Sequence, residues 1–181
     1  MAGLNSKTRI NLGKAELLLL EPTLDGMSIL GQIVAAFGVR EVRRCRTVDD
    51  ARKEVLGPPL DLILIGSDGQ DSSGYDFIRW LRRSGLQPNA FTPTILISGH
   101  TQVRNVVRAR DCGANFIVTK PVSPEVLLDR IVWVAREQRQ FISCEAYVGP
   151  ERRFHDSGPP PGVAERRQPE QESESTAGAA G

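Results

Sequence analysis

Four residues that could contribute to a chemical site each follow a short apolar run of the sequence: Glu21, Gly66, Ser98 and Lys120. In an open parallel sheet, functional groups gather beyond the carboxyl ends of the strands. If the apolar runs are neighbouring strands, a carboxylate, a hydroxyl and an amine lie close together at one edge of the sheet. We therefore expect one polar pocket there, in which the glycine offers no nucleophile.

Short apolar runs alternate with amphipathic stretches between about residues 16 and 138, which is the pattern of repeated βα units on a parallel sheet. The run 17–20 is continuously apolar, as a strand covered on both faces requires, whereas 39–45 is charged and predicts an edge strand. The other predicted strands are 60–65, 93–98 and 116–118. The pattern predicts the α/β class, with a doubly wound parallel sheet of five strands.

Helix signals separate the predicted strands. Thr47 and Ser123 are typical N-cap residues, and Gly38 follows the last apolar position of the first predicted helix. A helix after each strand accounts for residues 15–138 as one domain. Residues 1–14 are predicted to form an N-terminal lead.

Composition and charge restrict the classes of partner. The formal net charge is +1 with 25% charged residues, so the chain lacks the basic excess typical of nucleic-acid binding. The apolar run 17–20 ends at Glu21 and is too short for a signal peptide or a membrane span. Cys45, Cys112 and Cys144 form no C-x-x-C pair, which favours reduced, buried thiols. We expect a cytoplasmic protein whose partners are neither nucleic acid nor membrane.

Two pieces of the sequence are typical of one protein family: Gly-Ala-Asn-Phe-Ile-Val-Thr-Lys-Pro at 113–121, and Asp-Leu-Ile-Leu-Ile at 61–65, which leads through a polar loop to Gly74. They resemble the CheY-like receiver domain of bacterial two-component response regulators. The resemblance covers about residues 15–138 and implies the flavodoxin-like strand order 2-1-3-4-5. It also implies phosphorelay signal transduction, in which a histidine kinase phosphorylates an aspartate beside a magnesium ion.

Three working positions of that family are altered in this chain. The spacing of the two pieces puts Gly66 at the position of the acceptor aspartate, where it cannot accept a phosphoryl group. Pro22 replaces the second of two metal-binding acids, so only Glu21 is left and magnesium binding is expected to be weak or absent. Ile117 replaces the aromatic switch residue. The resemblance implies an atypical receiver that acts by protein–protein interaction, with no cofactor and no enzymatic activity.

Ser98 and Lys120 match the family's switch hydroxyl and lysine, and other interpretations stay open. Asp68 is a candidate relocated acceptor in a functional phosphorelay receiver, although two residues of extended chain span about 7 Å. Lys120 can instead pair with Glu21 or Asp68 as a structural tie, and Ser98 can cap the next helix. A small-molecule enzyme of flavodoxin-like fold is the most distant alternative, because the loop 66–69 lacks the glycine spacing of nucleotide-binding loops.

The predicted fourth helix carries Arg104 and Arg108 at a spacing that puts them on one helix face. In the receiver family, this helix belongs to the surface through which domains dimerise or dock. We expect the two arginines to meet an acidic patch on a signalling protein, such as a histidine kinase or another regulator. A homodimer through the same face is the second arrangement.

Residues 139–181 are predicted to form a flexible tail, because the proline- and glycine-rich stretch 158–162 cannot hold regular structure. This segment contains a motif similar to the Tyr-x-Gly-Pro-x-Arg-Arg ending of some alphaproteobacterial stand-alone receivers. Its residues are Tyr147, Gly149, Pro150, Arg152 and Arg153. The resemblance assigns no role to the motif.

Overall fold

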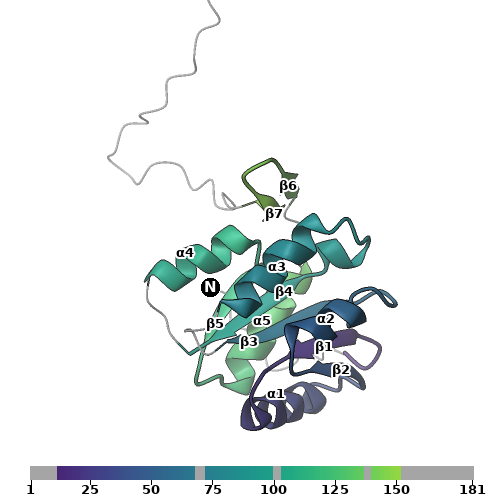
Figure 1. Ribbon diagram of the computed structural model, residues 1–181. Coiled ribbons are helices and arrows are strands. Elements are labelled where there is room, and N and C mark those ends of the chain that lie inside the picture. The colour runs from purple at the N-terminus through teal and green to yellow at the C-terminus, as the bar shows by residue number, and fades with distance from the viewer. Residues whose placement is uncertain (1–11, 68–71, 100–102, 137–139, 152–181) are drawn as a thin grey trace, which may run out of the picture.

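The computed structural model describes residues 12–67, 72–99, 103–136 and 140–151, and of residues 103–105 it describes the backbone only. At its centre is a five-stranded parallel sheet of order β2-β1-β3-β4-β5 (Figure 1). The strands are β1 (Glu16–Leu20), β2 (Glu41–Cys45), β3 (Leu62–Ser67), β4 (Thr94–Ser98) and β5 (Phe116–Thr119). The predicted fold class and strand order are confirmed, and the charged strand β2 lies at an edge.

The helices cover both faces of the sheet (Figure 1). They are α1 (Leu24–Ala36), α2 (Val48–Glu54), α3 (Ser73–Arg83), α4 (Val103–Cys112) and α5 (Pro124–Arg136), with a short 3₁₀ helix, η1 (Asn89–Phe91). Along β3, Ile63 and Ile65 pack with α2, α3 and α4, whereas Leu62 and Leu64 pack with α1 and α5. Because successive strand side chains point to opposite faces, a continuous apolar strand needs cover on both sides.

The predicted helix caps are confirmed. The hydroxyl of Thr47 accepts a hydrogen bond from the Asp50 N–H at 3.1 Å, and that of Ser123 accepts one from the Val126 N–H at 3.2 Å. Gly38, which follows α1, has a φ of 88°, where a side chain would be strained. Within the described residues, no helix has both the length and the apolar character needed to cross a membrane.

A hairpin occupies the start of the segment predicted to be a flexible tail. Strands β6 (Phe141–Ser143) and β7 (Val148–Pro150) pair antiparallel beside α3 (Figure 1). Residues 140–151 are therefore not part of a flexible tail, whereas residues 152–181 lie outside the described part of the chain and the tail there stays a prediction. Cys144 is exposed in the hairpin turn, so the prediction of a buried side chain was wrong for it, whereas Cys45 and Cys112 are buried.

The motif residues hold this hairpin against the domain. The Tyr147 hydroxyl donates to the Pro150 carbonyl at 2.7 Å, and Tyr147 is only 8% exposed. A Cβ on Gly149 would lie 2.8 Å from the Cα of Gly113, and a Cβ on Gly113 would lie 2.8 Å from the carbonyl oxygen of Val148. The hairpin backbone can pack this closely only because both positions are glycine.

Arg82 connects the hairpin, α3 and the sheet. Its side chain is 4% exposed, and its guanidinium lies 5.1 Å from the centre of the Phe141 ring. It donates to the carbonyls of Gly113, Ala90 and Thr92, to the Thr94 hydroxyl and to the Asn115 side-chain oxygen, at 2.8–3.1 Å. An arginine has five N–H donors, so every donor of this buried cation has an acceptor.

Candidate functional site

The predicted strand-end residues meet at one edge of the sheet. The register pairs Ser67 with Ser98 and Ser98 with Thr119, so the carboxyl ends of β3, β4 and β5 are level. The Lys120 backbone N–H continues this ladder by donating to the Ser98 carbonyl at 2.8 Å. The strand-end residues are therefore gathered at one edge of the sheet, as expected.

Glu21 lies at the centre of this cluster of strand-end residues. Its side chain is fully buried, and its Oε2 accepts a hydrogen bond from Lys120 Nζ at 3.0 Å in a salt bridge. Its Oε1 accepts from the Thr23 hydroxyl at 2.8 Å and from the Thr23 N–H at 3.2 Å. A buried carboxylate is tolerated only when it is paired and hydrogen-bonded, and these three contacts meet that need. Of the two salt bridges predicted for Lys120, the one with Glu21 is confirmed.

Gly66 lies directly beside this carboxylate. A Cβ built on Gly66 collides with Glu21 Oε2 and lies 2.6 Å from Glu21 Cδ. Even an alanine at this position would therefore displace the carboxylate from Lys120 and Thr23. The space into which a side chain at residue 66 would project is filled by Glu21.

The other predicted pocket residues have different places. The Pro22 carbonyl accepts hydrogen bonds from Arg46 at 3.3 Å, and Asp68 lies outside the described residues. Ser98 is fully buried as the last residue of β4. Residues 100–102, between it and the described start of α4, lie outside the described part of the chain, so the cap role of Ser98 stays a prediction. In the described ranges, no three His, Cys, Asp or Glu side chains gather at metal-binding distance.

The predicted partner face on α4 is partly committed to contacts within the domain. The Arg108 guanidinium lies 4.5 Å from the centre of the Tyr75 ring, and Tyr75 is fully buried on α3. The side chain of Arg104 lies outside the described residues. Ile117, at the switch position, is partly buried on β5 and packs against the core cluster on the α3 and α4 side.

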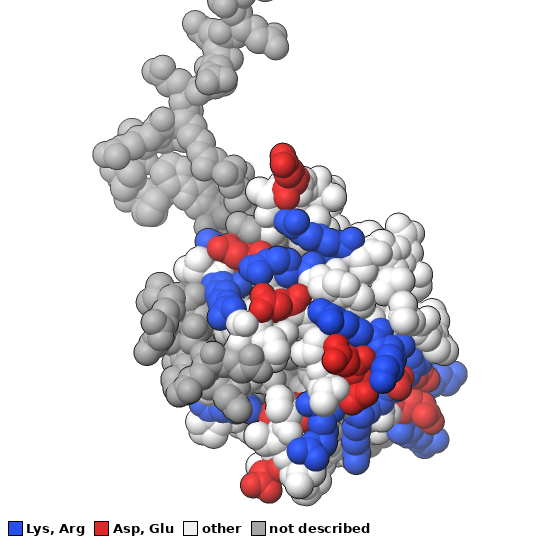
Figure 2. All heavy atoms as spheres, viewed as in Figure 1, with Lys and Arg blue, Asp and Glu red and all other residues white. Residues whose placement is uncertain are grey.

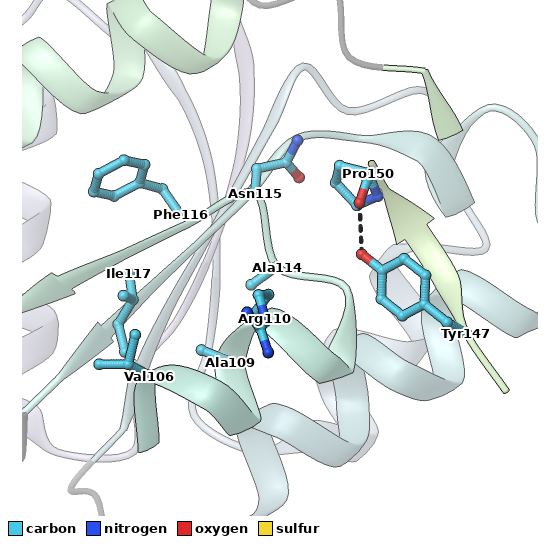
Figure 3. A pocket seen from close by; sticks show the side chains of 9 residues that line it. All are labelled: Val106, Ala109, Arg110, Ala114, Asn115, Phe116, Ile117, Tyr147 and Pro150. Carbon is cyan, nitrogen blue, oxygen red and sulfur yellow. Dashed lines mark hydrogen bonds between the residues drawn. The ribbon is translucent and has the colours of Figure 1, made fainter. Parts of the chain in front are cut away.

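A groove of about 200 Å³ opens between α4, β5 and the hairpin (Figure 3). Its lining side chains are mainly apolar, and Tyr147 and Pro150 of the tail motif form one side of it. The full set is Val106, Ala109, Arg110, Ala114, Asn115, Phe116, Ile117, Tyr147 and Pro150. The motif residues Arg152 and Arg153 lie outside the described residues.

Three buried groups have strongly shifted pKa values, and one of them is the Cys45 thiol, whose pKa is raised to about 11 by burial and by the nearby Glu54 and Asp50. Burial lowers the pKa of Arg82 to about 10, with no carboxylate among the described residues paired to it. Burial also raises the pKa of the Cys112 thiol to about 11. Nothing in the sequence distinguishes Arg82 from the exposed arginines near it, because its five acceptors come from distant segments.

Charge is mixed on the surface that carries α2, α3 and the hairpin. Figure 2 shows basic and acidic side chains interspersed there rather than gathered by sign. Several of them are paired: Arg79 lies 3.2 Å from Asp76, and Lys53 lies 3.6 Å from Asp50. This face offers no continuous basic strip of the kind that follows a phosphate backbone.

Comparison with known families and curated proteins gives a consistent result. Residues 18–132 match the model of the response regulator receiver domain. A stretch of 79 residues is 33% identical to the cell cycle response regulator CtrA of Brucella ovis, and covers 44% of this chain and 32% of that protein. The match thus spans about a third of the length of that curated relative.

Several solved structures with a similar fold are receiver domains. One is the receiver domain of a signal transduction histidine kinase from Syntrophus aciditrophicus, with a TM-score of 0.58 and 25% identity, covering 72% of this chain and 98% of that one. Another is the receiver domain of a sensor histidine kinase from Pseudomonas aeruginosa with a magnesium ion in its active-site cleft, with a TM-score of 0.60 and 19% identity, covering 68% of this chain and 98% of that one. The second likeness concerns the fold alone.

Proposed function

Because the chain belongs to the response regulator receiver domain family of two-component signalling, we propose that it is an atypical member that acts by binding a partner protein, without phosphorylation of an aspartate. One observation carries this proposal. The buried Glu21 carboxylate, paired with Lys120, fills the space beside Gly66 where an acceptor side chain would stand. The space beside Gly66 is occupied by the ion pair of Glu21 and Lys120.

The chemistry of phosphoryl transfer explains why this arrangement argues against an acceptor. The reaction needs an ionised oxygen as nucleophile and a hard-ligand metal site to neutralise the phosphoryl charge. Gly66 has no nucleophile, and the Glu21 oxygens are engaged by Lys120 and Thr23. The described residues therefore do not fit a magnesium site, and we infer that the metal binds weakly or not at all.

The binding face and location are further parts of the proposal. Receiver domains generally interact with histidine kinases or other regulators, and we place this contact on the α4 face with Arg104 and Arg108. The protein acts in the cytoplasm, an inference supported by its three free cysteines. Receiver domains are in general signalling domains rather than enzymes, and we infer the same of this chain. The mixed charge on the face in Figure 2 supports the inference that it binds no nucleic acid.

Incubation with acetyl phosphate and magnesium, followed by intact mass spectrometry, tests the proposal. We expect no phosphoryl adduct. An acid-stable, base-labile adduct that maps to Asp68 would favour a functional phosphorelay receiver with a relocated acceptor and overturn the proposal.

A rebuilt pocket supplies the positive control. In Gly66→Asp alone the new side chain competes with Glu21 for one space, so we expect little magnesium binding or phosphorylation. The triple variant Glu21→Asp, Pro22→Asp, Gly66→Asp shortens the blocking side chain and provides three carboxylates, and we expect it to bind magnesium and become phosphorylated. If the triple variant stays inert while folded, the register that puts Gly66 at the acceptor position is wrong.

The partner can be sought by a pull-down from the native cell with the full chain. The truncated bait must end after residue 151 rather than at residue 140, because the hairpin of residues 140–151 packs on the domain. Loss of a specific partner on reversal of Arg104 and Arg108 to Glu would support the proposed face. Because Arg108 also packs on Tyr75, the folding of that variant is checked by circular dichroism.

A further inference from the structure

The groove between α4, β5 and the hairpin has an apolar floor that no described segment of the chain covers completely. Val106 on its rim is 42% exposed, although it is a branched apolar side chain. Ala109 and Ala114 are small and leave depth below the rim, and Ile117 closes the β5 side. Such a concave apolar surface is suited to a side chain supplied from outside.

The size of the groove restricts its occupant. Sites for cofactors and drug-sized ligands are clefts of about 300–1,000 Å³, whereas an apolar cavity of about 150 Å³ holds one benzene ring. A groove of about 200 Å³ is therefore too small for a cofactor and large enough for one bulky apolar side chain. This favours a segment of a partner protein over a small molecule.

The charge at the groove restricts the flanking residues of that segment. Arg110 is the only charged residue among those that line it, and its side chain is 58% exposed. Asp111 lies 3.6 Å from Arg110 and offsets part of this charge, but it does not line the groove. An acidic residue beside the apolar anchor would complement Arg110.

The hairpin is required for this surface. Without Tyr147 and Pro150, the groove would be open on the side of the hairpin and bounded only by α4 and β5 (Figure 3). The bond from the Tyr147 hydroxyl to the Pro150 carbonyl and the Gly113–Gly149 backbone contact hold that wall in place. The described part of the tail motif thus has a structural consequence, because it builds one side of a binding groove.

We propose that the β6–β7 hairpin is part of the protein's interaction surface. The groove that the hairpin lines on one side binds one large apolar side chain from an acidic segment of a partner protein. This inference rests on the proposed function, since it identifies the surface through which a receiver without an acceptor makes contact. It differs from the general α4 face in requiring the hairpin.

The test uses a short synthetic probe and the full chain. The probe is acetyl-Glu-Glu-Leu-Glu-Glu-amide, and the matched peptides replace the central Leu by Ala or the four Glu by Lys. We expect saturable amide shifts in ¹⁵N–¹H spectra of Ala114, Ile117 and Tyr147, with a dissociation constant of about 1 mM, as suits a single anchor. Both matched peptides should bind at least about fivefold more weakly.

Two neighbouring valines supply matched variants. Val106 lines the groove and Val107 does not, yet they are 42% and 40% exposed. Val106→Glu should weaken probe binding at least about tenfold, whereas Val107→Glu, which adds the same charge nearby, should change it less than about twofold. Tyr147→Phe, which loses the bond to the Pro150 carbonyl, should weaken probe binding severalfold with the domain still folded.

Several results would overturn the inference: no saturable shift at the groove, equal binding of the Leu and Ala peptides, equal binding of the acidic and lysine peptides, or equal effects of the two valine variants. These failures are separate from failure of the proposed function. A chain that binds no probe but also accepts no phosphoryl group from acetyl phosphate would leave the proposed function intact.

Discussion

The close contact between Gly66 and Glu21 makes a quantitative prediction about stability. Gly66→Ala adds a Cβ that collides with Glu21 Oε2 and lies 2.6 Å from Glu21 Cδ. Although a carboxylate ends a flexible side chain, this one is fully buried and held by Lys120 and Thr23, so it cannot move at little cost. Overpacking of this kind costs about 1–3 kcal/mol.

The same substitution should be nearly neutral when Glu21 is absent. Gly→Ala restricts the unfolded chain and stabilises a protein by about 0.4–1 kcal/mol where the backbone tolerates it. The φ of Gly66 is not in the left-handed region, so the backbone does not oppose alanine. In a Glu21→Ala background we therefore expect Gly66→Ala to have no cost or a small benefit, and the coupling energy between the two sites to be about 2 kcal/mol.

Urea unfolding of the wild type, both single variants and the double variant, followed by circular dichroism, measures this coupling. Gly31→Ala in α1 is the control, because a Cβ there meets only the Arg44 side chain, at 3.3 Å, and its effect should be the same with and without Glu21. If the cost of Gly66→Ala is unchanged within about 0.5 kcal/mol in the Glu21→Ala background, Glu21 does not fill that space and the reasoning fails.

Three further predictions concern the buried groups and the thiols. Arg82→Lys leaves some of the five acceptors of Arg82 without a donor and should lower the free energy of unfolding by about 2–4 kcal/mol. The control Arg83→Lys loses one exposed hydrogen bond and should change the free energy of unfolding by less than about 1 kcal/mol in the same urea assay. Burial raises the pKa of the Cys112 thiol from 9.0 to about 11, so its protonated form stabilises the fold fully below pH 9, and this contribution of about 2–3 kcal/mol is lost as the pH rises to 11. Cys112→Ala should make the free energy of unfolding fall less steeply between pH 9 and 11. An unchanged dependence of the free energy of unfolding on pH would contradict this prediction. Iodoacetamide at neutral pH should modify Cys144 alone in the folded protein, and mass mapping of a second modified thiol would show that the core opens.

Much of the fold could be predicted from the sequence by itself, because local spacing carries the information. The continuous apolar runs of β1 and β3 can be satisfied only by cover on both faces, which requires helices above and below a parallel sheet. The caps at Thr47 and Ser123 were also recognisable, since a cap involves residues only a few positions apart. That Glu21, Ser98 and Lys120 share one edge follows from strand direction alone.

Only the tertiary structure decided what that edge contains. The side chain of Glu21 could in principle have faced a metal ion or Asp68, and its contact with Lys120 joins residues 99 positions apart. The hairpin has too few residues and too little periodicity to be predicted, because a two-stranded ribbon gains its stability by packing on α3 and on Gly113. Arg82 shows the same limit: its burial depends on acceptors from η1, β4 and the turn before β5, which come together only when the domain folds.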